Sequence, residues 1–123
     1  MSETVAYVSA ARTVTPAAAV LDLTRIRALI VVIDVTAIGP APSVVPTIDA
    51  VDVASGKVWN LITGAALTAI TGATPRVLKI APGITVAANL AVAEIVPERI
   101  RITMTHGNAD SITYTVCAHL LTY

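Results

Sequence analysis

The sequence has few of the residues that staple small folds or build common catalytic sites. Its 123 residues include one cysteine, one tryptophan and no phenylalanine, and only 13% are charged. A single cysteine excludes an internal disulfide framework, and a hydrophobic content of 55% excludes an intrinsically disordered chain. Eight basic and eight acidic residues cancel, so nucleic acid is not expected as a partner.

Motifs for phosphate, zinc or nucleophile chemistry are also missing. The chain has no glycine-rich dinucleotide or P-loop motif, no His-Glu-x-x-His and no Gly-x-Ser-x-Gly. Its longest uncharged run, residues 58–75, is interrupted by asparagine, glycine and threonine, so no membrane segment is expected. The first residues lack the basic and apolar regions of a secretory signal, and we expect synthesis in a cytoplasm. These absences predict a protein that is not an enzyme and uses no cofactor.

Alanine, valine, isoleucine and threonine dominate the chain instead, and β-branched side chains favour strands. Residues 28–36 are apolar on both faces, which predicts a central strand buried on each side. Residues 54–56 predict a hairpin turn, and residues 107–110 predict that the last two strands pair with each other. The alanine-rich residues 85–94 are expected to connect the sheets. The other predicted strands cover residues 44–53, 57–63, 76–81, 98–106 and 111–122.

This succession of short strands and turn signals predicts an all-β fold. We expect one domain, residues 1–123, with no internal boundary. The predicted architecture is an antiparallel β-sandwich, Ig-like or jelly-roll-like, of about seven to eight short strands; a small barrel is the alternative. Residues 1–19 are predicted to form an extended N-terminal arm that contains one short strand and could add a strand to a neighbouring subunit.

Cys117 and His119 are the residues that come closest to a chemical site. They are two apart on a predicted strand, so both project to the same face, where they could contact a metal or act as a nucleophile and base. His106 might approach across the predicted hairpin, but no other third ligand is evident. The prediction is therefore a small thiol and two surface or interface histidines, with no metal site and no catalytic site.

Two other residues have competing interpretations. Asp34 interrupts the most apolar strand, so its carboxylate should reach a loop or pair with Arg25 or Arg27. Trp59 is predicted to anchor the core, because a chain with so few aromatic residues would place its largest side chain there. A sugar-stacking platform is the alternative for Trp59.

A surface with so few charges predicts assembly with partner subunits. The polar stripe of residues 99–105 lies on the solvent side of its strand, and its guanidinium groups suit carboxylates of a neighbouring subunit. The residues predicted to form this contact surface, two of them from the N-terminal arm, are Tyr7, Arg12, Arg99, Arg101 and Thr103.

Several segments after residue 27 carry a resemblance to a known group of proteins. They are ALIVVIDVT at 28–36, ASGK at 54–57 followed by VWNLITGAA at 58–66, RVLKIAPG at 76–83, and residues 99–121 with THGNADSITY at 105–114. These segments resemble the small minor virion or head-decoration proteins encoded beside the capsid genes of tailed bacteriophages. The match is one of strand pattern and includes no motif tied to a reaction.

The resemblance implies a β-sandwich that binds the outside of a capsid and reinforces contacts between capsid subunits. The partners it implies are the major capsid protein and further copies of the chain, a homotrimer being favoured. The expected location is then the capsid surface of the virion. The alternative is a receptor- or carbohydrate-binding module of a head or tail fibre. The third hypothesis is a small hydrolase or metal enzyme whose site contains Cys117 and His119.

Overall fold

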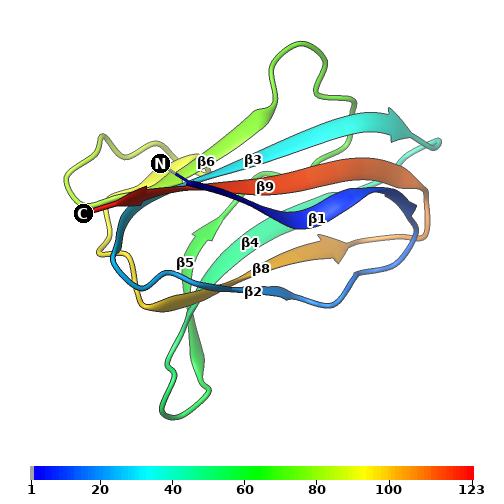
Figure 1. Ribbon diagram of the computed structural model, residues 1–123. Coiled ribbons are helices and arrows are strands. Elements are labelled where there is room, and N and C mark those ends of the chain that lie inside the picture. The colour runs from blue at the N-terminus through cyan, green and yellow to red at the C-terminus, as the bar shows by residue number, and fades with distance from the viewer. Residues whose placement is uncertain (1) are drawn as a thin grey trace.

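The computed structural model describes residues 2–123 and contains two β-sheets packed face to face (Figure 1). Among these residues no helix has the length and hydrophobicity needed to cross a membrane. The all-β prediction is confirmed. The strands are β1 (Ser2–Arg12), β2 (Ala19–Asp22), β3 (Ile26–Ile38), β4 (Val44–Val51), β5 (Val58–Thr63), β6 (Arg76–Ile80), β7 (Ala91–Val92), β8 (Arg99–His106) and β9 (Ile112–Thr122).

The order of the strands decides between the two predicted sandwich types. One sheet has the order β1-β9-β3-β6-β7 and the other the order β2-β8-β4-β5. Every pair is antiparallel except the short β6–β7 pair. Without β7, the chain fills two four-stranded sheets by crossing between them after almost every strand, as in a jelly roll. The predicted sandwich is therefore a jelly roll with one added two-residue strand.

The core lies between the sheets and consists mainly of valine, leucine and isoleucine. In β3 the side chains of Leu29, Val31, Ile33 and Val35 point inward and are buried, as the period of two requires. β3 is a central strand, flanked by β9 and β6. The prediction that it is buried on both faces is wrong, because no layer formed by residues 2–123 covers the outer face of this sheet and the intervening side chains are only half-buried.

The last two strands do not form the predicted hairpin. β8 pairs with β2 and β4, whereas β9 lies in the opposite sheet between β1 and β3. The turn at residues 107–110 instead crosses from one sheet to the other beside residues 39–43: Gly107 donates its N–H to the Ser43 carbonyl at 2.8 Å, and Gly39 donates to Ser111 at 2.6 Å. The alternation of apolar residues indicates which face of a strand is buried, but it does not indicate which other strand pairs with it.

The N-terminal segment is extended, as predicted, but its described part is not a free arm. β1 pairs with β9 from Ser2 opposite Leu120 to Arg12 opposite Ile112, with two irregularities in register. It forms the edge of the five-stranded sheet, and β2 forms an edge of the other. Met1 lies outside the described residues. Residues 2–12 therefore pair with β9 of the same chain and do not form an unpaired strand.

The β4–β5 hairpin is confirmed, and Figure 1 shows it projecting beyond the body of the sandwich. Pro46 lies one residue before the first β4–β5 pair, Thr47 with Thr63. The N–H that proline lacks is therefore not needed for the ladder to β5. The prediction that Trp59 anchors the core is wrong: the side chain is 53% exposed. Its strand partner, Ala50, is the last residue of β4 that also pairs with β8, so Trp59 lies where the hairpin leaves the four-stranded sheet.

Candidate functional site

Tyr7, a predicted contact residue, is part of the core. Its ring is 7% exposed, and its hydroxyl lies 2.8 Å from the carbonyl oxygens of both Ala17 and Ile102, between which it shares its proton. The same hydroxyl accepts a hydrogen bond from the N–H of Ala19 at 3.1 Å. Burial raises the pKa of Tyr7, so the hydroxyl stays protonated at neutral pH. The contacts tie β1 to β2 and β8 across the edge of the sandwich.

Arg12, another predicted contact residue, covers the end of the core. Its guanidinium carbon lies 4.5 Å from the centre of the Tyr114 ring and 5.5 Å from that of Tyr7, within the range of cation–π attraction. It also donates hydrogen bonds to the carbonyls of Val8 at 2.7 Å and Tyr114 at 3.1 Å. Most of its hydrogen-bonding capacity is therefore used within the chain.

His106 lies beside the same aromatic pair, on the inside of the sandwich. Its Nε2 is 3.1 Å from the Tyr114 hydroxyl, and its Nδ1 is buried without a hydrogen-bond partner among the described residues. Burial, with a contribution from the Arg12 charge, lowers the pKa of His106 below its ordinary value, so the imidazole is neutral at pH 7. Burial also raises the pKa of Tyr114 to about 12.

The polar stripe of β8 lies on the outer face of the four-stranded sheet, as predicted. Arg101 is engaged within the chain: its Nε donates to Asp49 at 3.2 Å, and Asn60 donates to the other oxygen of that carboxylate at 3.1 Å. Arg99 and Thr103 occupy neighbouring half-exposed positions. The stripe therefore leaves Arg99 and Thr103 as its accessible predicted contacts, while the Arg101 guanidinium already has a carboxylate partner.

The carboxylate of Asp34 is hydrogen-bonded to a loop residue, which was one of the two predicted ways to satisfy it. Its Oδ1 accepts a hydrogen bond from the hydroxyl of Thr71 at 2.7 Å, and the N–H of Val35 donates to that hydroxyl at 3.0 Å. The carboxylate thereby anchors the long β5–β6 connection to β3. The described contacts give it a structural role.

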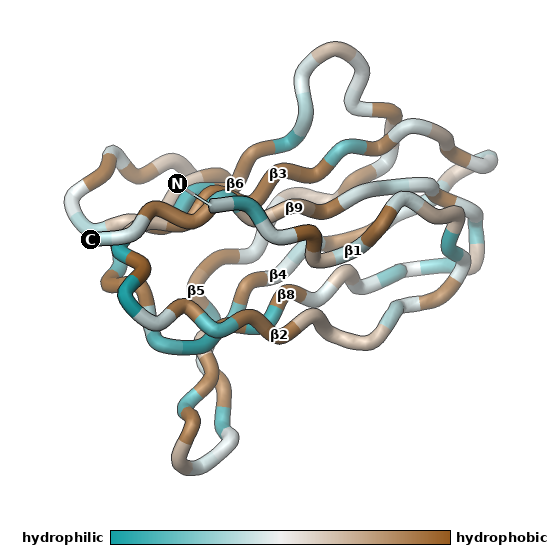
Figure 2. Tube along the Cα trace, viewed as in Figure 1, coloured by the Kyte–Doolittle hydropathy of each residue, from teal (hydrophilic) through white to brown (hydrophobic). Residues whose placement is uncertain are grey.

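The projecting β4–β5 hairpin exposes several apolar side chains, among them Trp59, which was predicted to anchor the core. Trp59 is accompanied by Val53, 49% exposed, and Val58, 39% exposed. Figure 2 shows apolar residues along this hairpin as well as along the strands of the body. A shallow hollow of about 400 Å³ lies beside the indole ring; it is lined by residues 51–54, Trp59, Pro97 and Glu98. A bulge in β5 between Asn60 and Ile62 breaks the alternation of this strand, and no residue pattern in the sequence marks it.

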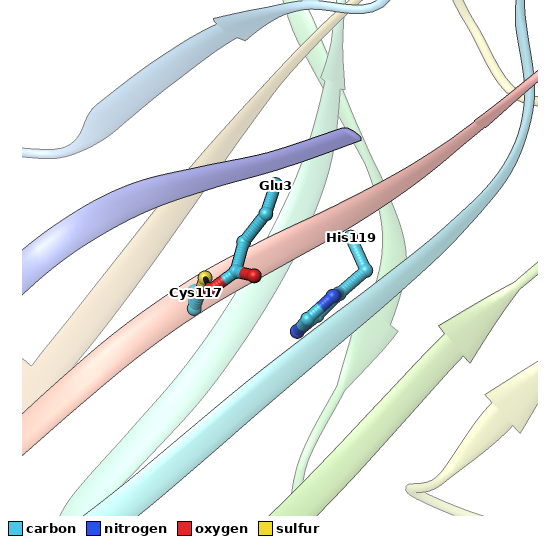
Figure 3. A group of neighbouring side chains, drawn as sticks. All are labelled: Glu3, Cys117 and His119. Atoms are coloured by element: carbon cyan, nitrogen blue, oxygen red, sulfur yellow. Dashed lines mark hydrogen bonds between the residues drawn. The ribbon is translucent and has the colours of Figure 1, made fainter. Parts of the chain in front are cut away.

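The structure also brings a third ligand-type side chain to Cys117 and His119. Glu3, on β1, lies opposite His119 in the register of the strand pair, and all three side chains are on the outer face of the five-stranded sheet (Figure 3). The thiol of Cys117 donates to Oε1 of Glu3 at 3.0 Å. The potential ligand atoms of the three residues lie within 4.8 Å of one another. Burial, and then the neighbouring Glu3, raises the pKa of Cys117 to about 11, so the thiol is protonated at neutral pH.

Sequence reasoning considered His106 as the third member of this cluster, and the structure separates them. His106 contacts Tyr114, an inward-facing residue of β9, whereas Cys117 and His119 face outward. Glu3 was missed because it is 114 positions from Cys117 in the chain, and no local periodicity reports such a pairing. Comparison with protein-family models, curated protein sequences and solved structures finds no match to this chain.

Proposed function

We propose that this protein is a non-enzymatic structural component of a tailed-bacteriophage virion that binds the outer surface of the capsid as an oligomer, a trimer being favoured. The observation that carries the proposal is the apolar surface of the β4–β5 hairpin, where the only tryptophan of the chain is exposed. Exposed apolar patches mark interaction sites, and tryptophan is enriched among the residues that dominate binding at the centres of interfaces.

Three further features support the same proposal. The chain carries no net charge and few charged residues, which suits contacts made by apolar packing. The jelly-roll architecture recurs in viral capsid proteins, although a fold alone does not assign a function. The resemblance of the segments at residues 28–36, 54–66, 76–83 and 99–121 to head-decoration proteins supports the capsid as the surface that such a module would bind. A protein that binds only the assembled lattice stabilises the lattice by mass action.

Binding to capsids tests the proposal directly. The purified chain is sedimented with empty capsids assembled from a major capsid protein of a tailed bacteriophage, and its free mass is measured by light scattering. We expect saturable co-sedimentation, a free mass of three times the 12.6 kDa chain, and capsids that resist heat better when decorated. A monomer that stays in the supernatant would refute the proposal.

The contribution of the hairpin is tested with Trp59→Ser. Because Trp59 is exposed, the change should leave folding intact while weakening capsid binding at least about tenfold, as for an interface hot spot. Tyr123→Ser is the matched control, since Tyr123 is an aromatic residue outside the hairpin that is 84% exposed. Equal capsid binding by the two variants would show that the hairpin is not the contact.

A carbohydrate-binding module is the second candidate, favoured by the hollow beside Trp59. An exposed indole with the carboxylates of Asp52 and Glu98 on the same hollow provides a stacking face and hydrogen-bond acceptors for a sugar. Because Trp59 is the only tryptophan, its fluorescence reports on this position alone. Saturable quenching by an oligosaccharide, lost with Asp52→Asn, would favour this candidate; a blue shift on adding capsids, unaffected by sugars, would favour the first.

A further inference from the structure

A carboxylate, a thiol and an imidazole meet on the outer face of the five-stranded sheet. The Sγ of Cys117 and Oε1 of Glu3 are 3.0 Å apart, and the cluster including a ring nitrogen of His119 spans at most 4.8 Å. In a tetrahedral zinc site with zinc–sulfur and zinc–nitrogen bonds of about 2.3 and 2.0 Å, neighbouring ligand atoms are about 3.2–3.8 Å apart. The widest separation therefore exceeds a coordinating distance by no more than about 1.5 Å, a change that the side-chain rotamers can supply.

The backbone holds this arrangement in place. β9 lies between β1 and β3, so the positions of Cys117 and His119 are fixed on both sides by ladder hydrogen bonds. Apolar residues flank the cluster: Val5 and Val32 lie opposite Cys117 on the two neighbouring strands, and Ile30 lies opposite His119. Cys117 is buried, while Glu3 is exposed and His119 is half-buried. A cation would thus have a route in from solvent and little water on its inner side.

We propose that Glu3, Cys117 and His119 form a binding site for one zinc ion, with water as the fourth ligand. Zinc is the cation that matches a mixed sulfur, nitrogen and oxygen set, whereas magnesium and calcium require oxygen ligands. On binding, the S–H proton of Cys117 passes to solvent and the thiolate bonds to the metal. A ring nitrogen of His119 and the carboxylate of Glu3 complete the protein ligands, and no electron is transferred.

The site would link the edge strand β1 to the centre of its sheet. At present Glu3 is attached to β9 by its backbone pairing and by one thiol hydrogen bond. A metal bond across the strand pair would hold the first residues of β1 more tightly, and binding to the folded state alone stabilises that state by mass action. This inference is independent of the proposed virion function, since it concerns the opposite sheet from the polar stripe and the hairpin.

The experiment uses the full chain, reduced and stripped with a chelator, and titrated with Co²⁺ and then Zn²⁺. We expect one Co²⁺ per chain, a thiolate-to-cobalt charge-transfer band in the near ultraviolet, visible bands of tetrahedral intensity, and displacement of both by Zn²⁺. The melting temperature should rise with zinc concentration. Absence of saturable binding, or a cobalt spectrum without the thiolate band, would overturn the proposal.

Variants separate the site from adventitious binding. Cys117→Ser should remove the charge-transfer band, and Glu3→Gln and His119→Gln should each weaken Zn²⁺ binding at least about tenfold, because even outer partners of a metal site are worth that much. Glu3 is exposed, so Glu3→Gln gives a result even if substitution of the buried cysteine impairs folding. The matched controls are His106→Gln and Glu98→Gln, which lie outside the cluster. Affinity that falls equally in the controls, or not at all in the ligand variants, would contradict the site.

Discussion

Tyr7 shows at the scale of one residue how an edge of the sandwich is closed. Its buried hydroxyl contacts the carbonyls of Ala17 and Ile102 and the N–H of Ala19, groups that belong to two segments far apart in the chain. We expect Tyr7→Phe to lower the free energy of unfolding by about 1–3 kcal/mol, since it leaves buried polar groups without partners. Urea denaturation measures the change, with Tyr123→Phe as the exposed control. Equal stability of the two variants would mean that water replaces the hydroxyl without loss.

His106 is the residue that should couple stability to pH near neutrality. Its pKa is about 6.5 in the unfolded chain and lower in the folded protein, so the unfolded state takes up a proton first as the pH falls. The contribution of His106 to the free energy of unfolding should be constant above about pH 7.5 and decrease below about pH 6.5 until the folded-state pKa is passed. Asp22 and Asp52, whose pKa values are lowered from 3.8, act only in more acidic solution.

Denaturation at a series of pH values from 7.5 to 5 measures this dependence. His106→Gln keeps a hydrogen-bonding group beside Tyr114 but does not titrate, so the slope between pH 6.5 and 5 should become smaller in the variant. A slope that persists unchanged would assign the dependence to another group. The neutral imidazole is a consequence of burial, which the sequence did not indicate for a histidine at the end of a strand.

At the scale of the secondary-structure elements, the β4–β5 pair ends in a close backbone contact. The N–H of Gly64 donates to the carbonyl of Pro46 at 2.8 Å, and a Cβ added to Gly64 would lie 2.7 Å from the Cγ of that proline. The ring cannot rotate away as a long side chain could. We expect Gly64→Ala to destabilise the protein by about 1–3 kcal/mol, the usual range for overpacking a core.

Gly107→Ala is the matched control for this prediction. A Cβ at Gly107 would meet its nearest atom at 3.5 Å, an ordinary van der Waals distance. Thermal unfolding of the two variants should show a clear loss only for Gly64→Ala. If both variants melt together with the parent protein, the end of β5 shifts to admit the methyl group, and the contact is not a constraint on the pair.

How far the elements could be predicted depended on the range of the interactions that define them. The β4–β5 hairpin followed from its turn residues, because the pairing is local. The pairing of β9 with β1 and β3 joins segments far apart in the chain, and only the packed structure selects it. For the same reason two of the predicted contact residues, Tyr7 and Arg12, proved to be engaged within the chain, while the exposed Trp59 was missed.

For the whole molecule, the small number of charges predicts a weak response to salt. The described residues contain one ion pair, Arg101–Asp49, and the guanidinium side chain is 40% exposed. A partly exposed pair contributes little and is screened, so the melting temperature should change by no more than about 2 °C between low salt and 1 M NaCl. Sodium sulfate should raise it, since sulfate strengthens apolar burial. A large loss of stability in NaCl would contradict this prediction, because it would require stabilising charge interactions beyond the Arg101–Asp49 pair.

The sequence by itself determined that this protein is made of strands and which side of most strands faces the core. β-branched residues and alternation act over a few neighbouring positions, and these signals survive in the linear chain. Tertiary structure alone decided which strands are neighbours, that the hairpin carrying Trp59 extends past the opposing sheet, and that Glu3 meets Cys117 and His119. Those outcomes depend on how two whole sheets pack and cross over, which no local stretch of sequence records.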